Sequence, residues 1–348
     1  MKDFLVSIHL IVKDGEKYIR ECLRALLNQN FDDYEILVFD NDSKDKTREI
    51  VKNEFPRAKL IKFDRNYGLG GGFNRSLQYS NSKYVVLLCV DVFLSPNFLT
   101  EAVKILEKDS GIGALQPKVL VWNLKQNDFF PRNYRNELDI PTANTIDTTG
   151  FEIFKSRRII NRGHGEKDSG QYKEGEIFSW EGACPIFLRK ALENAKMPFN
   201  NGEYLDEDFE WYADDIDFGW RMRILGWKSY FSPKILAWHD RQTTKRLKKN
   251  KKDFIQLRRG VTSKKKMLDW RNQRLAMVKN EYSCKFLKDF PYFFIREVQL
   301  LIYFLFFEQS SLFGIFGFLK LLPKMLKKRN WIMKRKKMSP KEIEKWFQ

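Results

Sequence analysis

The side chains best suited to chemistry lie between residues 206 and 239. This segment holds the acidic runs Asp206-Glu207-Asp208 and Asp214-Asp215-Ile216-Asp217, and it ends at Ala237-Trp238-His239. A carboxylate beside a second carboxylate binds a proton more tightly than usual, which suits a general base. The imidazole of a histidine is a good ligand for Mn²⁺-type ions. The residue types therefore indicate acid–base chemistry and cation binding in one segment.

Polar and glycine-rich runs also occur in the first hundred residues. The run Phe39-Asp40-Asn41-Asp42-Ser43 and the run ending in Asp91 contain apolar, strand-like stretches, and Asn66–Asn74 contains Gly-Leu-Gly-Gly-Gly. A carboxylate can accept hydrogen bonds from a base N–H or ribose hydroxyls, and glycines let a backbone approach a ligand closely. On its own a glycine run is more often a flexible turn. This one also lacks the Gly-Lys-Ser/Thr of a phosphate-binding loop.

The elements expected to position these residues alternate along the chain. Apolar, β-branched runs at 5–12, 34–40, 59–63 and 84–90 alternate with helical patterns at 16–28, 46–53, 71–79 and 96–108. This rhythm predicts a parallel, doubly wound sheet. Ligands of such sheets bind beyond the carboxyl ends of the strands, where acidic and amide groups are found here. Residues 123–175 lose the rhythm and are predicted to run over the sheet as a long excursion.

Three features together resemble a known family: the strand end at 39–43, the glycine-rich segment 66–74, and the order and spacing of the acidic cluster up to His239. They resemble the family 2 glycosyltransferases with the GT-A fold, especially the rhamnosyl- and galactofuranosyl-transferring members. The resemblance implies an α/β fold, a doubly wound mixed sheet with helices on both faces. It also implies a catalytic domain over residues 1–240, with a donor half at about 1–120 and an acceptor half at about 121–240.

The resemblance implies a site for a nucleoside-diphosphate sugar and a divalent cation, Mg²⁺ or Mn²⁺. The donor-binding residues would be Asp40, Asp42, Asn66, Gly70, Asn74 and Asp91. Asp91 and His239 would hold the cation, which would bridge the diphosphate oxygens of the donor. The chain departs from the family's Asp-x-Asp pattern at Cys89, which stands where the first Asp is expected.

The acceptor half is expected to supply the catalytic base. By the motif match the base is Asp215, which would take the proton from the acceptor hydroxyl in an inverting transfer. The resemblance implies that Asp214, Trp180 and Glu181 bind the acceptor. Trp180 offers a flat apolar face for a sugar ring, although ordinary core packing explains a tryptophan equally well.

The formal charge is unevenly distributed. The whole chain carries +18, yet the first 239 residues carry −2 and residues 240–348 carry +20. A basic segment rich in Phe and Leu indicates an anionic partner, either lipid or nucleic acid. The apolar stretch 290–322 is interrupted by charges, and its longest uncharged part, 298–307, has ten residues. A spanning helix needs about 20 apolar residues, so we expect helices that lie in the interface of an anionic membrane.

A helical cap packed on the catalytic domain is an alternative for residues 241–348, and the two interpretations are compatible. Met1-Lys2-Asp3 leads directly into a strand-like run, without the apolar stretch of a signal peptide. The four cysteines are far apart and form no Cys-x-x-Cys pair, which fits a reducing compartment. We therefore expect a peripheral protein on the cytoplasmic face of the cell membrane.

The sequence as a whole predicts an inverting, metal-dependent glycosyltransferase. It would move a sugar from a nucleoside-diphosphate sugar to a glycan or lipid-linked acceptor in cell-surface polysaccharide synthesis. Three alternatives stay open: transfer to a protein or soluble acceptor, a non-catalytic membrane-bound scaffold suggested by Cys89, and a nucleic-acid-binding protein suggested by the basic tail. The sequence contains no recognisable nucleic-acid module, so nucleic acid is not the expected partner.

Overall fold

The computed structural model describes residues 3–122, 144–241, 258 and 260–348. The strands of this part are β1 (Val6–Val12), β2 (Tyr34–Asp40), β3 (Ala58–Lys62), β4 (Tyr84–Cys89), β5 (Val92–Leu94), β6 (Ile112–Val121), β7 (Ile146–Thr148), β8 (Phe151–Ile153), β9 (Ile159–Asn161), β10 (Gly175–Ile177), β11 (Ile186–Leu188) and β12 (Lys228–His239). The α-helices are α1 (Ile19–Leu27), α2 (Thr47–Glu54), α3 (Gly68–Ser76), α4 (Phe98–Leu106), α5 (Arg189–Ala195), α6 (Asp214–Ile224), α8 (Ser263–Asn280), α9 (Ser283–Phe307), α10 (Gly314–Lys334) and α11 (Pro340–Glu344). Short 3-10 helices are η1 (Leu77–Tyr79), η3 (Glu207–Phe209) and η4 (Gln309–Phe313).

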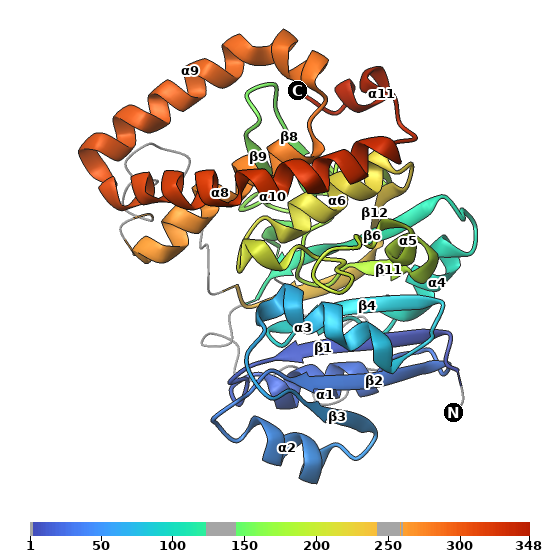
Figure 1. The fold of residues 1–348 in the computed structure, drawn as a ribbon. Coiled ribbons are helices and arrows are strands. Elements are labelled where there is room, and N and C mark those ends of the chain that lie inside the picture. The colour runs from blue at the N-terminus through green and yellow to red at the C-terminus, as the bar shows by residue number, and fades with distance from the viewer. Residues whose placement is uncertain (1–2, 123–143, 242–257, 259) are drawn as a thin grey trace.

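One mixed sheet forms the centre of the molecule (Figure 1). Its strands follow the order β10-β12-β6-β11-β4-β1-β2-β3, with β5 paired to β12 and β7 paired to β6. Strands β1 to β4 are parallel, whereas β11 runs antiparallel between β4 and β6. The bounds of these four parallel strands agree with the sequence prediction to within one residue. Because helices cover both faces, the predicted doubly wound mixed sheet is confirmed.

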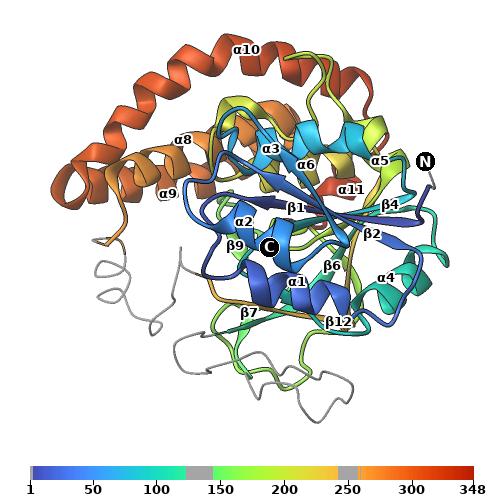
Figure 2. The ribbon, with the colours of Figure 1, turned by 90° about the horizontal axis from the view of Figure 1, so that it is seen from below.

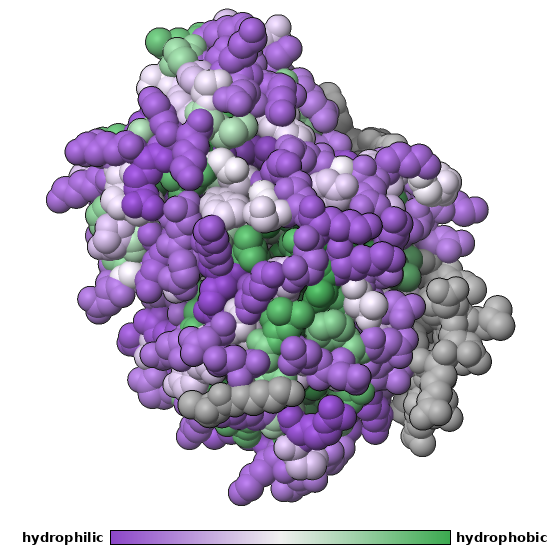
Figure 3. All heavy atoms as spheres, turned by 90° about the vertical axis from the view of Figure 1, so that its right-hand side faces the viewer, coloured by the Kyte–Doolittle hydropathy of each residue, from purple (hydrophilic) through white to green (hydrophobic). Residues whose placement is uncertain are grey.

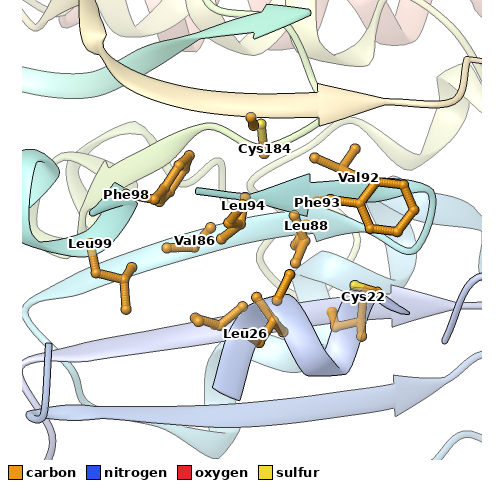
Figure 4. Close-up of a cluster of buried hydrophobic side chains, with 14 of the residues drawn as sticks. Cys22, Leu26, Val86, Leu88, Val92, Phe93, Leu94, Phe98, Leu99 and Cys184 are labelled. Atoms are coloured by element: carbon orange, nitrogen blue, oxygen red, sulfur yellow. The ribbon is translucent and has the colours of Figure 1, made fainter. Parts of the chain in front are cut away.

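Helices α1, α2 and α4 cover one face of the sheet. Cys22 and Leu26 of α1 belong to the same buried cluster as Leu88 of β4 and Phe93 of β5 (Figure 4). Fully burying an apolar side chain of this size contributes about 1.5–3 kcal/mol. This packing fixes the turn between β4 and β5, which carries Asp91.

Helices α3, α5 and α6 cover the opposite face. Three phenylalanines meet there, Phe73 of α3, Phe187 of β11 and Phe218 of α6. The ring centroids of Phe73 and Phe187 are 5.8 Å apart, and those of Phe187 and Phe218 are 6.2 Å apart. On its other side α6 places Trp220 in a separate cluster, together with Ile332 of α10. Helix α6 is therefore a middle layer with apolar packing on both sides.

The C-terminal helices form a layer over α6. Helix α8 packs on α6 and α10 packs on α8, whereas α9 arches away from the sheet and returns through η4 (Figures 1 and 2). The last residue also joins the body, because the N–H of Gln348 donates to the carbonyl of Ile153 in β8 at 3.0 Å. Helices of residues 260–348 thus pack over α6 and reach β8. The basic cluster at 245–249 lies outside the described residues.

Large apolar side chains are exposed along α9 and α10. Only Asp289 and Phe304 of α9 are buried. The exposed ones are Leu287, Phe290, Tyr292, Phe294, Ile295, Val298, Leu301, Ile302, Leu305, Phe306, Phe307, Phe313, Ile315, Phe316, Leu319 and Leu326. Within the described part of the chain, α9 is the one helix whose length and composition suffice to cross a membrane. The face on the right-hand side of Figure 1, by contrast, is mostly hydrophilic with an apolar area near its centre (Figure 3).

Candidate active site

A strained turn presents the two central carboxylates. Asp214 and Asp215 are the first residues of α6, and Ala213 before them has φ 63°. Glu210 and Tyr212 are also left-handed, with φ 61° and 70°. Non-glycine residues in this conformation cost about 1–3 kcal/mol each and cluster at functional sites. The turn at 210–213 therefore needs support from the rest of the molecule.

Helix α8 supplies that support through two neighbouring side chains. The buried Nδ2 of Asn272 donates to the carbonyls of Phe209, Trp211 and Tyr212 at 2.7–2.8 Å. Arg271 donates to the carbonyl of Phe209 at 3.2 Å and, through Nε, to Oδ1 of Asn272 at 2.9 Å. Sequence reasoning missed both residues because they lie in the segment that was interpreted as a basic tail. The C-terminal helices are therefore part of the framework of the site.

Asp215 has the surroundings of a general base. The N–H groups of Ile216 and Gly182 donate to its carboxylate at 2.8 and 3.2 Å. Burial raises the pKa of Asp215 well above its usual range, and the charges of Asp214 and Glu181 raise it further. The pKa of Asp214 is raised to about 6, mainly by burial. Both residues keep partial exposure, so a substrate can reach this pair of carboxyl groups, whose pKa values are raised.

The glycine-rich segment is a helix, α3, that packs against these carboxylates. A Cβ on Gly70 would lie 3.0 Å from Oδ2 of Asp214, and a Cβ on Gly72 would lie 2.8 Å from Cγ2 of Ile11. Gly70 itself is buried. The glycines let α3 fit between β1 and the start of α6. The missing side chain of Gly70 makes room for Asp214, and the contact of Gly70 with the nucleotide stays a prediction.

Asn74 joins α3 to the acceptor half. Its Nδ2 donates to the carbonyl of Leu205 at 2.8 Å and to Glu207 at 3.1 Å, and its Oδ1 accepts from the N–H of Leu205 at 2.9 Å. The Asn74 amide is thus bonded within the protein, and its contact with the donor stays a prediction. Asn66 is exposed, and its Oδ1 accepts from the N–H of Gly68 at 2.9 Å. Asn66 therefore keeps an amide nitrogen available at the surface beside α3.

Asp40 and Asp42 differ in their surroundings at the carboxyl end of β2. The carboxylate of Asp40 is fully buried, accepts from the N–H of Ser43 at 3.1 Å and pairs with Arg48 at 3.0 Å. Asp40 thus shapes the loop after β2, and its contact with the nucleotide stays a prediction. Asp42 is partly exposed and pairs with Lys44 at 2.7 Å. Asp42 is therefore the accessible carboxylate at this strand end.

The two predicted metal ligands lie side by side. Nε2 of His239, at the end of β12, is 3.4 Å from Oδ2 of Asp91. Nδ1 of His239 donates to the buried Asp147 at 2.9 Å, and Asp147 also accepts from Arg241 at 2.7 and 2.9 Å. Burial alone would lower the pKa of His239, but its hydrogen bonds to Asp147 and Asp91 outweigh burial and raise the pKa to about 9. A carboxylate that orients a histidine in this way is common at metal sites.

Glu181 and Trp180 are committed to contacts within the protein. Oε1 of Glu181 accepts from Arg241 at 2.8 Å, and the side chain is only 9% exposed. Trp180 is 0% exposed and packs edge-on against Phe187 with ring centroids 4.8 Å apart. The predicted stacking of the acceptor on Trp180 is corrected, because its ring is enclosed, whereas the acceptor contact of Glu181 stays a prediction. Trp180 is a core residue, as its alternative interpretation expected, and Glu181 acts on Asp215 through its charge.

Cys89 lies between the two groups of functional side chains. Its Sγ is 3.8 Å from the carbonyl of Gly182, whose N–H donates to Asp215. Burial raises the pKa of Cys89, and the nearby charges of Asp91 and Asp214 add to the effect. Cys89 is therefore a neutral thiol, a poor ligand for a hard cation. Cys89 thus lies between the carboxylate pair at the start of α6 and the pair formed by Asp91, in the turn after β4, and His239, at the end of β12.

Lysines neutralise a buried acidic cluster below the turn. Glu203, Asp206 and Asp208 have oxygens within 4.8 Å of one another. Nζ of Lys328 lies 2.5 Å from Glu203, 2.5 Å from Asp206 and 2.8 Å from Asp208. Lys279 also pairs with Asp206 at 2.5 Å. An ammonium group thus occupies the position between these acids, so two residues of the run 206–208 have a structural role.

Comparisons with known proteins identify the family of the chain. The profile of glycosyl transferase family 2 matches residues 7–194. The uncharacterized glycosyltransferase MJ1057 of Methanocaldococcus jannaschii is 30% identical over 139 residues, which is 38% of this chain and 48% of that protein. The UDP-Glc:alpha-D-GlcNAc-diphosphoundecaprenol beta-1,3-glucosyltransferase WfgD of Escherichia coli is 29% identical over 111 residues, 32% of this chain and 44% of that protein. The chain therefore aligns with less than half the length of these two relatives.

A solved structure shares the fold. The mannosyltransferase PcManGT from Pyrobaculum calidifontis, in complex with GDP-Man and Mn²⁺, superposes with a TM-score of 0.51 at 15% identity. The match covers 95% of this chain and 86% of that chain, so it includes the C-terminal helices.

Proposed function

Because the family profile covers more than half of its length, this chain belongs to glycosyl transferase family 2, and we propose that it transfers a sugar, with inversion, from a nucleoside-diphosphate sugar to a glycan or lipid-linked acceptor. One observation carries the proposal. A carboxylate pair with raised pKa values and an acid–imidazole pair suited to a cation surround the same residue, Cys89. Inverting transfer needs a base for the acceptor and a positive charge for the leaving diphosphate.

Asp215 is the proposed base. It takes the proton of the acceptor hydroxyl while the acceptor oxygen bonds to the anomeric carbon. The bond from that carbon to the diphosphate breaks, and the nucleoside diphosphate leaves with the bonding electrons. The N–H groups of Gly182 and Ile216 hold the carboxylate in place. The neighbouring Asp214 raises the pKa of Asp215 by its charge, which strengthens the base.

A divalent cation, Mn²⁺ or Mg²⁺, fits Asp91 and His239. Asp147 holds the proton of Nδ1, which leaves Nε2 of His239 facing Asp91. A carboxylate oxygen and an imidazole nitrogen form a suitable donor set for Mn²⁺. When bound, such a cation neutralises charge on the diphosphate.

We propose that the acceptor is presented at an anionic membrane surface on the cytoplasmic side. Phe306, Phe313 and Phe316 are 72%, 64% and 71% exposed on and between α9 and α10. Basic side chains at 327 and 334–337 are exposed on and just after α10. This combination of apolar and basic groups suits peripheral binding to anionic lipid. The acceptor in the name of WfgD is a diphosphoundecaprenol-linked sugar, which supports a lipid-linked acceptor and a role in cell-surface polysaccharide synthesis.

The test is release of nucleoside diphosphate by the purified full chain, over a panel of nucleotide sugars with and without Mn²⁺. We expect metal-dependent release from one donor and its loss in Asp215→Asn. Asp32→Asn, the same exchange at an exposed position outside the site, is the matched control and should retain release. If no nucleotide sugar of the panel releases nucleoside diphosphate and none binds, the proposal is refuted and the non-catalytic scaffold is favoured.

Vesicle sedimentation tests the membrane part separately. The chain should sediment with vesicles that contain phosphatidylglycerol, and replacing Phe306, Phe313 and Phe316 by serine should release it. Binding that survives this triple exchange would contradict the role of the apolar side chains of α9 and α10.

A further inference from the structure

Trp211 is the one exposed tryptophan of the chain, all of whose tryptophans lie in the described residues. Its exposed fraction is 50%. Its ring stacks on that of Tyr212, with centroids 4.6 Å apart and an interplanar angle of 29°. Because Tyr212 covers one face of the indole, the open area belongs to the other face and the edges. Such a flat apolar face with a polar N–H is well suited to a sugar ring.

The ring of Trp211 is held in place by its surroundings. The backbone carbonyl of Trp211 accepts a hydrogen bond from Nδ2 of Asn272 at 2.7 Å. Nζ of Lys265 on α8 lies 5.5 Å from the centroid of Trp211 and 4.8 Å from that of Tyr212. The backbone of the residues on both sides, Glu210 and Tyr212, is left-handed. An exposed indole on a strained, supported turn adds little to stability, and strain of this kind is typical of ligand sites.

Trp211 is also close in the chain to the reacting groups. It precedes Asp214 by three residues and Asp215 by four. A Cβ on Gly68 would lie 3.3 Å from the carbonyl of Glu210, so the turn runs along the first residues of α3. The same helix contacts Asp214 at Gly70. The indole thus belongs to the same short turn that fixes the proposed base.

We propose that Trp211, backed by Tyr212, is an acceptor subsite on which a sugar ring of the glycan acceptor stacks. Lys265 at the rim of the two rings would donate hydrogen bonds to the sugar hydroxyls. The inference rests on the proposed glycosyl transfer, because the base Asp215 defines which substrate lies beside the turn. It gives Trp211 the role that the sequence assigned to Trp180, whose ring is buried.

Binding is tested without turnover. The full chain is labelled with 5-fluorotryptophan, and Trp211→Phe identifies the ¹⁹F signal of Trp211. Methyl glycosides of common hexoses and N-acetylhexosamines are then titrated, and UDP and GDP with Mn²⁺ are titrated separately. We expect at least one glycoside to shift the Trp211 signal saturably. A signal that responds to no glycoside, or only to nucleotides, would overturn the subsite.

Kinetics separate this inference from the proposed function. Donor hydrolysis reports the proposed activity, and transfer to the glycoside that binds reports the subsite. Trp211→Ala should raise the KM for that glycoside about 3- to 10-fold. Trp211→Phe should bring the KM most of the way back to that of the unmodified chain. Tyr79→Ala, at an exposed aromatic outside the site, should leave both activities unchanged. If Trp211→Ala loses donor hydrolysis and transfer to the same extent, the role of Trp211 is merely structural. If the unmodified chain hydrolyses no donor, the proposed function is refuted instead.

Discussion

Replacing Asn272 by alanine should damage catalysis from a helix that carries none of the proposed catalytic groups. The substitution removes one amide NH₂ that donates to the carbonyls of Phe209, Trp211 and Tyr212. A hydrogen bond contributes about 1 kcal/mol net, and a buried carbonyl left without a donor costs about 1–3 kcal/mol. We therefore expect the free energy of unfolding to fall by about 3 kcal/mol. The left-handed turn then relaxes, and Asp215 moves with it.

The assay compares kcat and KM for the donor in the folded variant. A shift of about 1 Å in a catalytic group lowers the rate about 100-fold, so kcat should fall much more than the KM for the donor rises. Gln273→Ala is the matched control, because this neighbouring amide bonds to two side chains of the C-terminal helices, donating to Asp269 at 2.8 Å and accepting from Arg296 at 3.4 Å. Its effect on stability should stay within about 0.5 kcal/mol. A folded Asn272→Ala protein with kcat within about twofold of the unmodified chain would refute the reasoning.

Three further predictions follow from the charged groups. Lys328→Met should lower the free energy of unfolding by about 3–5 kcal/mol, measured in urea, because it leaves three carboxylates without this cation. An unchanged midpoint of the urea unfolding curve would contradict this prediction. Asp215→Asn should raise the melting temperature above neutral pH, since a carboxyl whose folded pKa is raised is costly when ionised, and the gain should vanish in acid where the group is protonated. The apparent affinity for Mn²⁺, measured by calorimetry, should rise about tenfold per pH unit up to about pH 9, because His239 with a pKa of about 9 must lose a proton to bind it; an affinity independent of pH would exclude His239 as a ligand.

The sequence predicted best what depends on short segments. The strand bounds followed from the alternation of apolar runs, and the strand ends pointed to Asp42 and Asp91. The prediction also brought Asp91 together with His239, which the structure places 3.4 Å apart. Motif order carried that pairing, since the two residues stand far apart in the chain.

The sequence could not show which side chains become hydrogen-bond or ion-pair partners when distant segments pack together. Asp147 holds His239 across 92 positions, and Lys328 reaches Asp206 across 122. Nothing in the composition around Asp147 or Lys328 marks them as partners. Burial was equally hidden: Trp180 and Trp211 both lie in polar, turn-like runs, yet only the fold shows that the first is enclosed by Phe187 and the second is open.

The salt bridges of Lys328 also set an order of events during protein synthesis. Glu203, Asp206 and Asp208 leave the ribosome more than a hundred residues before the lysine that neutralises them. Strands β1 to β4, which pair in parallel within the first ninety residues, can form before that lysine is synthesised. A nascent chain therefore lacks one counter-charge of this acidic cluster until α10 is translated. Helix α9, with its exposed apolar side chains, is complete by then, so the acidic cluster receives this counter-charge only after that apolar surface has been synthesised.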